Sequence, residues 1–115
     1  MKHTGSCHCG NIKFEMEGEL TGGVACNCSI CLRKGTLLTF VPTTQFKLLT
    51  PNENITSYTF NKHVIKHKFC AICGVQCFAE GLDPKGNTVM AVNMRCLDNI
   101  ELDAIPVHHY DGKAI

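Results

Sequence analysis

Seven of the nine cysteines in this chain fall into three tight groups, and these groups constrain its folding more than any other feature. The groups are Cys7-x-Cys9, Cys26-x-Cys28-x-x-Cys31 and Cys70-x-x-Cys73. Thiols two or three positions apart can turn towards one metal ion. Two such pairs complete the tetrahedral ligand set of a structural zinc, whereas three protein ligands leave one position open for chemistry. The pattern therefore predicts one closed site and one open site, with two zinc ions per chain.

The size and composition of the chain also favour metal-assisted folding. With 115 residues, we expect a single domain over 1–115. The chain has no Trp, six Phe and two Tyr, so its apolar core is modest. A domain this small buries only part of its surface, and bound metal would supply part of its folding free energy.

Charge and hydropathy limit the partners and the compartment. The formal net charge is +1, so there is no overall attraction to nucleic acid or to acidic membranes, and we expect neither as a partner. The first ten residues are polar, and no apolar run approaches the roughly 20 residues of a membrane span. We expect a cytoplasmic protein, in which reduced thiols favour metal binding over disulfides.

Short alternating segments separated by turn residues predict a mainly β fold. The clearest strand is 11–17, where Ile12, Phe14 and Met16 alternate with charged residues. The other expected strands are 36–41, 46–49, 55–60, 64–69, 76–79 and 88–92. A hairpin turn is expected at Asn61–Lys62 and a helical turn over Ser29–Lys34, ended by Gly35.

The first and third cysteine groups are expected to share one ion. Gly10 and Gly74 directly follow Cys9 and Cys73, and glycine there lets the chain turn so that backbone N–H groups face the sulfurs. Such a site would tie the first strand to the later hairpin. The alternative is two unrelated pairs of buried or redox thiols, although a redox CxxC normally sits in a βαβ context that this chain lacks.

The middle group, Cys26, Cys28 and Cys31, has no obvious fourth ligand. Cys77, Cys96 or a histidine could complete it as a structural site; otherwise water or a substrate thiolate would take the open position. Three thiolates on Zn²⁺ leave a net charge of −1, which suits a fourth soft ligand better than the generation of hydroxide. A metal-bound thiol loses its proton and is prepared for carbon–sulfur chemistry.

Basic residues near these cysteines are candidates for substrate binding. Arg33 and Lys34 could bind the carboxylates of an anionic thiol such as glutathione, or could be ordinary exposed side chains. Arg95 follows an apolar strand and could point towards a pocket. His108 and His109 could approach the second zinc as acid or base, although a strand end is the simpler interpretation. The basic run 62–68 is interpreted as the solvated face of a strand.

Motifs along the whole chain resemble the glutathione-dependent formaldehyde-activating enzyme family, which also includes centromere protein V. The matching segments are Gly5-Ser6-Cys7-His8-Cys9-Gly10-Asn11-Ile12, Cys26-Asn27-Cys28-Ser29-Ile30-Cys31-x-Arg33-x-Gly35, Phe69-Cys70-x-x-Cys73-Gly74, Val92-Asn93-Met94-Arg95-Cys96-Leu97-Asp98 and His109-Tyr110-Asp111-Gly112-Lys113.

The resemblance implies an Mss4-like β-tent of twisted antiparallel sheets with zinc knuckles. It also implies a structural zinc held by Cys7, Cys9, Cys70 and Cys73 and a second, catalytic zinc held by the other cysteine group. The family's namesake reaction joins glutathione to formaldehyde as S-hydroxymethylglutathione.

Two function classes follow from these features. The first is a zinc-dependent carbon–sulfur lyase that forms or cleaves S-hydroxymethylglutathione or a related thiol–carbonyl adduct; its partners would be a small thiol and a carbonyl compound. The second is a non-catalytic, zinc-stabilised module that binds a protein. An open second site distinguishes the first class, and a closed or empty one with an exposed apolar patch distinguishes the second. A thiol redox or metal-buffering protein is a third alternative, distinguished by labile zinc and easily formed disulfides.

Overall fold

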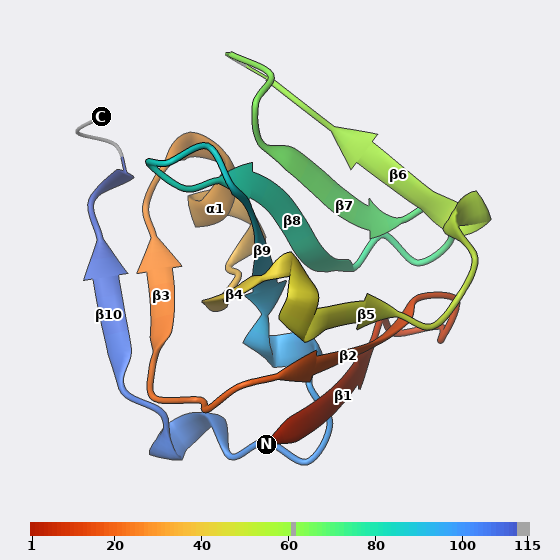
Figure 1. The fold of residues 1–115 in the computed structure, drawn as a ribbon, viewed down its shortest axis with the longest axis horizontal. Coiled ribbons are helices and arrows are strands. Elements are labelled where there is room, and N and C mark those ends of the chain that lie inside the picture. Colours follow the sequence, from red (N-terminus) through yellow and green to blue (C-terminus); the bar gives the residue numbers. More distant parts are fainter. Residues whose placement is uncertain (61, 113–115) are drawn as a thin grey trace.

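The computed structural model describes residues 1–60 and 62–112 and contains two β-sheets (Figure 1). The smaller sheet has three strands in the order β1-β2-β5. Their bounds are β1 Lys2–Ser6, β2 Lys13–Glu17 and β5 Phe46–Leu48. Both pairs of neighbours are antiparallel.

The larger sheet has seven strands in the order β10-β3-β4-β9-β8-β7-β6. Their bounds are β3 Gly23–Cys26, β4 Leu38–Pro42, β6 Ile55–Tyr58, β7 Lys66–Cys70, β8 Gln76–Leu82, β9 Thr88–Asn93 and β10 Val107–Tyr110. The helix α1 spans Ser29–Lys34, and single 3₁₀ turns cover Thr43–Gln45, Asn52–Asn54, Met94–Cys96 and Leu102–Ala104.

The expectation of a mainly β fold of antiparallel sheets is confirmed, with one exception at an edge. The strands β10 and β3 pair in parallel, which makes the larger sheet mixed. Because parallel neighbours need a long crossover, this pair joins distant parts of the chain and leaves no local sequence signal.

Most of the expected elements are present with small shifts at their ends. The helical turn over Ser29–Lys34 is confirmed, and Gly35 ends it in the left-handed conformation with φ 68°. The strand expected from residue 64 begins at Lys66 instead, because Val64 and Ile65 lie exposed outside the ladder. The strands β6 and β7 pair antiparallel, but Asn61 of the expected hairpin turn lies outside the described residues.

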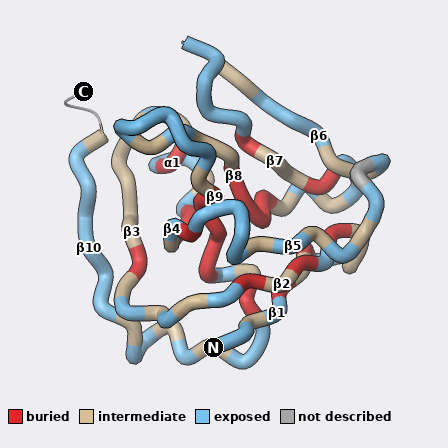
Figure 2. Tube along the Cα trace, viewed as in Figure 1, coloured by how far each residue is buried: buried red, intermediate tan, exposed pale blue. Residues whose placement is uncertain are grey.

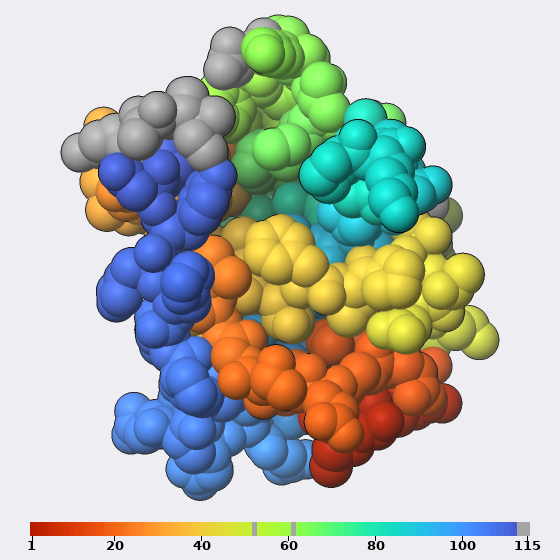
Figure 3. All heavy atoms as spheres, turned by 60° about the vertical axis from the view of Figure 1, so that its left-hand side comes forward, coloured from red at the N-terminus to blue at the C-terminus, as the bar shows by residue number. Residues whose placement is uncertain are grey.

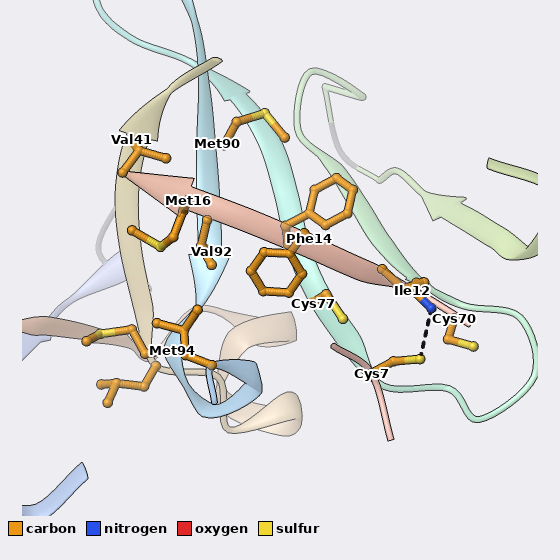
Figure 4. Close-up of a cluster of buried hydrophobic side chains, with 13 residues drawn as sticks. Cys7, Ile12, Phe14, Met16, Val41, Cys70, Cys77, Met90, Val92 and Met94 are labelled. Carbon is orange, nitrogen blue, oxygen red and sulfur yellow. Dashed lines mark hydrogen bonds between the residues drawn. The ribbon is translucent and has the colours of Figure 1, made fainter. Parts of the chain in front are cut away.

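The main core lies between the two sheets. Ile12, Phe14 and Met16 are almost completely buried. Phe14 and Met16 lie on the same face of β2 (Figure 4). Phe46 stacks on Phe14 with ring centroids 5.5 Å apart and contacts Phe78 at 4.8 Å. Buried positions follow β2, β8 and β9, whereas β10 is exposed along its length (Figure 2).

The opposite face of the larger sheet carries small side chains. Phe78 packs into the main core, and its neighbour Ala79 faces the other way because strand side chains alternate. Ala79 and Ala91, together with Leu38 and Cys31, form a second buried cluster under α1. Small residues here leave space between the sheet and the elements that cover it.

In the described part of the chain, no helix has the length and apolar character to cross a bilayer.

Candidate metal centres

Two groups of cysteine sulfurs come together in the folded chain. The first contains the side chains of Cys7, Cys9, Cys70 and Cys73, whose Sγ atoms all lie within 4.8 Å of one another. Two of these separations are 3.7 Å, for Cys7 to Cys9, and 3.5 Å, for Cys9 to Cys70. Thiolates on a tetrahedral zinc with Zn–S bonds of about 2.3 Å lie about 3.8 Å apart. The group therefore has the donor type and spacing of a zinc site.

This four-cysteine group lies where the two sheets meet. Cys7 directly follows β1, and Cys70 ends β7. Both side chains lie beside Ile12 and the start of β2 (Figure 4). Cys7 and Cys70 are buried, and Cys9 is exposed. The group thus lies between the smaller sheet and the larger one, where a shared metal ion would tie the two together.

Backbone N–H groups surround the sulfurs of the first group. The N–H of Ile12 donates to Cys7 Sγ at 3.3 Å, and the N–H groups of Ile72 and Cys73 both donate to Cys70 Sγ at 3.4 Å. Gly74 makes this turn possible with φ 81°. Donors aimed at sulfur favour the thiolate, the form that binds a metal.

The acidities of these thiols differ because their surroundings differ. A hydrogen bond from the backbone of Val75 lowers the pKa of Cys73 to about 6. Hydrogen bonds from the backbone and side chain of Asn11 lower the pKa of Cys9. Burial raises the pKa of Cys7 to about 11. A metal ion would offset the burial of that thiolate, because it supplies the opposite charge directly.

The second group is local in sequence and lies under α1. Cys26 ends β3, Cys28 precedes α1 and Cys31 lies within the helix, and their Sγ atoms lie within 4.8 Å of one another. The N–H of Cys28 donates to Cys26 Sγ at 3.4 Å. Burial, and then the neighbouring Cys28, raise the pKa of Cys31 to about 12. This spacing also suits a zinc ion.

The second group contains three ligands and not four. In 1–60 and 62–112, no histidine, carboxylate or further cysteine joins these three sulfurs within the same spacing. The two other cysteines lie elsewhere: Cys77 is fully buried in the main core, and Cys96 packs against that core and hydrogen-bonds the Gln76 carbonyl at 3.5 Å. A hydrogen bond with Cys96 and burial raise the pKa of Cys77. Neither of these two candidates for a fourth ligand therefore lies at the second group.

The C-terminal segment packs directly against the second group, and the possibility that His108 and His109 approach it agrees with their positions in the two cavities beside these cysteines. The N–H of Asn27 donates to the Tyr110 carbonyl at 3.2 Å, and the Asn27 side chain donates to Asp111 at 2.9 Å. A Cβ on Gly112 would lie 2.6 Å from Cys26 Sγ, so only glycine fits there without a shift. Figure 3 shows this segment (blue) lying along the molecule's edge beside the orange segment that contains β3.

Lys34 lies next to the second group in a polar cluster. Its ammonium donates to His67 Nδ1 at 3.1 Å and to Gln76 Oε1 at 2.5 Å. His67 and Gln76 are buried, so the expectation that the whole basic run 62–68 faces solvent is wrong at position 67. Alternation along β7 explains this, because Lys66 is exposed and the next side chain points inward. Burial, and then the positive charge of Lys34, lower the pKa of His67 to about 4.

The two arginines named as candidates for substrate binding are both exposed, but only Arg95 lies at a cavity of the second group. Arg33 is exposed on the outside of α1, where its guanidinium donates to the Ser29 carbonyl at 2.8 Å. It does not line either of the cavities that the cysteines of the second group line. Arg95 follows β9 in a 3₁₀ turn and lines one of these cavities together with Cys26 and Cys31.

Two cavities meet at the second group. The Arg95 cavity, of about 620 Å³, has a mixed lining. Cys26 and Cys31 line it together with apolar side chains such as Leu37 and Leu102, and with charged or polar ones, which include Arg95, Asp103, His109 and Asp111. The Phe40 cavity, of about 400 Å³, is lined by all three cysteines, Lys34, His67 and His108, and mainly by apolar residues such as Val24, Leu38, Phe40, Phe60, Ile65 and Leu82. The second group therefore borders one cavity that carries several charged side chains and one that is mainly apolar.

Comparison with known proteins agrees with this architecture. The family model described as "Glutathione-dependent formaldehyde-activating enzyme" matches residues 2–110. A crystal structure of a Rhodobacter sphaeroides protein, solved in a structural genomics programme, superposes with a TM-score of 0.78. That protein is 27% identical over 94% of this chain and 100% of its own.

Proposed function

This chain belongs to the glutathione-dependent formaldehyde-activating enzyme family, and we propose that it is a zinc-dependent carbon–sulfur lyase. It would form or cleave S-hydroxymethylglutathione or a related adduct of a thiol and a carbonyl compound. The observation that carries this proposal is the three-cysteine group at the meeting point of two cavities. A site with three protein ligands and access from two sides can accept one substrate from each.

The two cysteine groups would divide structure and chemistry between them. Cys7, Cys9, Cys70 and Cys73 would hold a structural zinc, because four ligands at the junction of the sheets leave no position for a substrate. Cys26, Cys28 and Cys31 would hold the second zinc. When bound there, zinc would supply a positive centre that keeps an incoming thiol deprotonated.

The chain's own residues would place the thiol. The Arg95 cavity carries a guanidinium that can pair with a glutathione carboxylate, as an anionic thiol requires. The thiolate sulfur would then attack the carbonyl carbon: the C–S bond forms, the C=O π electrons move to oxygen, and that oxygen takes a proton from water. No oxidant or reductant is consumed, and the reverse sequence cleaves the adduct.

Lys34 would donate a hydrogen bond to the carbonyl oxygen. An ammonium has three N–H donors, and two of them are used by His67 and Gln76. These contacts fix its position beside the cysteines, and the third donor would stabilise the negative charge that develops on the oxygen. Arg33 does not line either cavity, so we expect it to contribute less to substrate binding than Arg95 does.

A non-catalytic protein-binding module remains the second candidate, because exposed apolar side chains surround the Phe40 cavity. Phe40, Ile65, Leu82 and Tyr110 have exposed fractions between 44% and 54%. Such a patch also suits a protein partner. The two candidates differ in whether the second zinc accepts an external thiol.

Exchange NMR with ¹³C-formaldehyde and glutathione tests the proposal. The zinc-loaded protein should accelerate exchange between free aldehyde and S-hydroxymethylglutathione above the uncatalysed rate, and Cys28→Ser should abolish the acceleration. Cys96→Ser is the matched control, since Cys96 lies outside both cysteine groups, and it should keep the wild-type rate. Equal exchange rates with and without the wild-type protein would contradict the proposal.

A further inference from the structure

We propose that the carbonyl substrate of this protein carries an apolar body, as a medium-chain aliphatic aldehyde does, and that this body occupies the Phe40 cavity. The inference rests on the proposed lyase function and goes beyond it, because it assigns a substrate class larger than formaldehyde. It follows from the size, lining and position of the cavity.

The cavity is much larger than formaldehyde. A water molecule occupies roughly 30 Å³ of the liquid. Formaldehyde has only one more non-hydrogen atom than water, whereas the cavity measures about 400 Å³. Formaldehyde at the sulfurs would leave most of this space empty or filled by water against apolar walls. The apolar walls would then contribute nothing to the binding of formaldehyde.

Away from Lys34 and the two histidines, the cavity lining selects against charged substrates. Its walls are mainly aliphatic and aromatic, with Leu38 and Ala91 buried on the sheet side. Glutathione carries two carboxylates and an ammonium, and burying them against such walls would cost several kcal/mol without partners. The polar groups of glutathione find better partners in the Arg95 cavity. The Phe40 cavity is therefore left for the second substrate.

Small residues on β8 and β9 create the space. Ala79, Gly81 and Ala91 line the cavity on the face of the sheet opposite the main core. Larger residues at these strand positions would fill it, as Phe78 and Val92 fill the other face. Four large apolar side chains at the cavity, Phe40, Ile65, Leu82 and Tyr110, stay substantially exposed in the free protein. An alkyl chain bound between them would cover this apolar surface.

The polar end of the cavity matches an aldehyde group. Cys26, Cys28 and Cys31 line it, and so does Lys34, whose ammonium is held by His67 and Gln76. An aldehyde carbon placed at the sulfurs would have its oxygen beside Lys34 and its alkyl chain along Leu38 and Phe40. The same cavity thus offers one donor for the oxygen and apolar walls for the chain.

Chain-length kinetics test the assignment. With zinc-loaded protein and glutathione, we expect kcat/KM for adduct formation to rise from propanal through butanal and pentanal to hexanal, after subtraction of the uncatalysed rate. Each buried methylene should contribute about a fourfold increase. These aldehydes differ little in intrinsic reactivity, so the trend would report binding. A flat or falling series, with formaldehyde still converted, would overturn this inference and leave the lyase function intact.

A binding measurement separates the cavity from catalysis. Hexan-1-ol has the same chain but cannot add a thiol, and NMR titration of the zinc-loaded protein should show saturable binding. Gly81→Val should weaken that binding and lower the hexanal-to-formaldehyde rate ratio at least tenfold. A Cβ at position 81 meets Ile65 at an ordinary 3.9 Å, so the variant should fold.

Glu80→Val, at a neighbouring position of β8 that does not line the cavity, is the matched control and should leave binding and the ratio as in the wild type. Hexan-1-ol binding that Gly81→Val does not change would overturn the assignment. Failure with every aldehyde, formaldehyde included, would overturn the lyase function and with it the substrate proposed here.

Discussion

The two cysteine groups use the same donor atoms, yet they lie in contrasting parts of the molecule. The four-cysteine group joins Cys9 to Cys70 across 61 positions of sequence, where the two sheets meet. The three-cysteine group spans only Cys26 to Cys31, on the far face of the larger sheet beside two cavities. One group brings together cysteines from distant strands, and the other borders two cavities.

From this contrast we infer that a metal ion would have a different role at each group, according to the number of ligands and their separation along the chain. A metal that closes a long loop removes much of the conformational freedom of the unfolded chain and so stabilises the fold. Ligands from one short turn close almost no loop, so a metal there stabilises the fold little. Four variants test whether one group has a structural role and the other a catalytic role. The first variant is the one with the largest expected effect.

Cys70→Ser should prevent stable folding. Cys70 is fully buried and shares its site with cysteines from the other sheet. Structural zinc typically contributes on the order of 10 kcal/mol of apparent binding free energy, comparable to the whole stability of a small domain. Thermal melts followed by circular dichroism in the presence of zinc should show no cooperative transition. A melting temperature equal to that of the wild type would refute the structural role.

Cys28→Ser should separate activity from stability. Loss of one of three ligands should lower the rate of glutathione adduct formation by on the order of a hundredfold or more, because even supporting contacts around a metal matter 10–100-fold. The melting temperature should fall by only a few degrees, since this group does not connect the sheets. The kinetic assay and the melt are made on the same sample. Unfolding of this variant would remove the distinction between the two groups.

Gly112→Ala should weaken metal binding at the three-cysteine group alone. The added methyl would press on Cys26 Sγ at 2.6 Å. We expect zinc affinity there to fall roughly tenfold, measured by competition with a chromophoric chelator, while the other zinc stays bound. Gly81→Ala is the matched control because its methyl meets only Ile65 at 3.9 Å. Equal affinities in both variants would show that the C-terminal segment does not support the site.

Arg95→Ala should have the smallest effect of the four. Removing the guanidinium from the Arg95 cavity should raise KM for glutathione roughly tenfold with little change in kcat, because the pairing acts on binding. Arg33→Ala provides the comparison, since that side chain lies outside both cavities and should change KM less than twofold. Equal effects of the two substitutions would contradict the assignment of the Arg95 cavity to the thiol.

The sequence predicts the parts of this protein whose signals are local. The helical turn over Ser29–Lys34 is confirmed. It could be predicted because its signals, Gly35 and the spacing of the cysteines, lie within or next to the turn itself. The strand that contains Phe14 is also confirmed. It could be predicted because apolar and charged residues alternate along it. The grouping of the cysteines also follows from their spacing together with the family resemblance.

The missed elements depend on distant partners. Lys2–Ser6 and Val107–Tyr110 have no apolar alternation, and they become strands β1 and β10 by pairing with β2 and β3. Gly5 illustrates the dependence, because a Cβ there would lie 2.5 Å from the Phe14 ring. The Phe40 cavity could not be predicted either, because nothing local shows that Gly81 and Ala91 share a face with the cysteines.

Native mass spectrometry with glutathione tests most directly whether one cysteine group is closed and the other open. We expect the wild-type chain to carry two zinc ions and to gain one glutathione when the thiol is added. Cys28→Ser should retain one zinc and bind no glutathione. One zinc in the wild type and no glutathione adduct, or an adduct that persists in Cys28→Ser, would contradict the account.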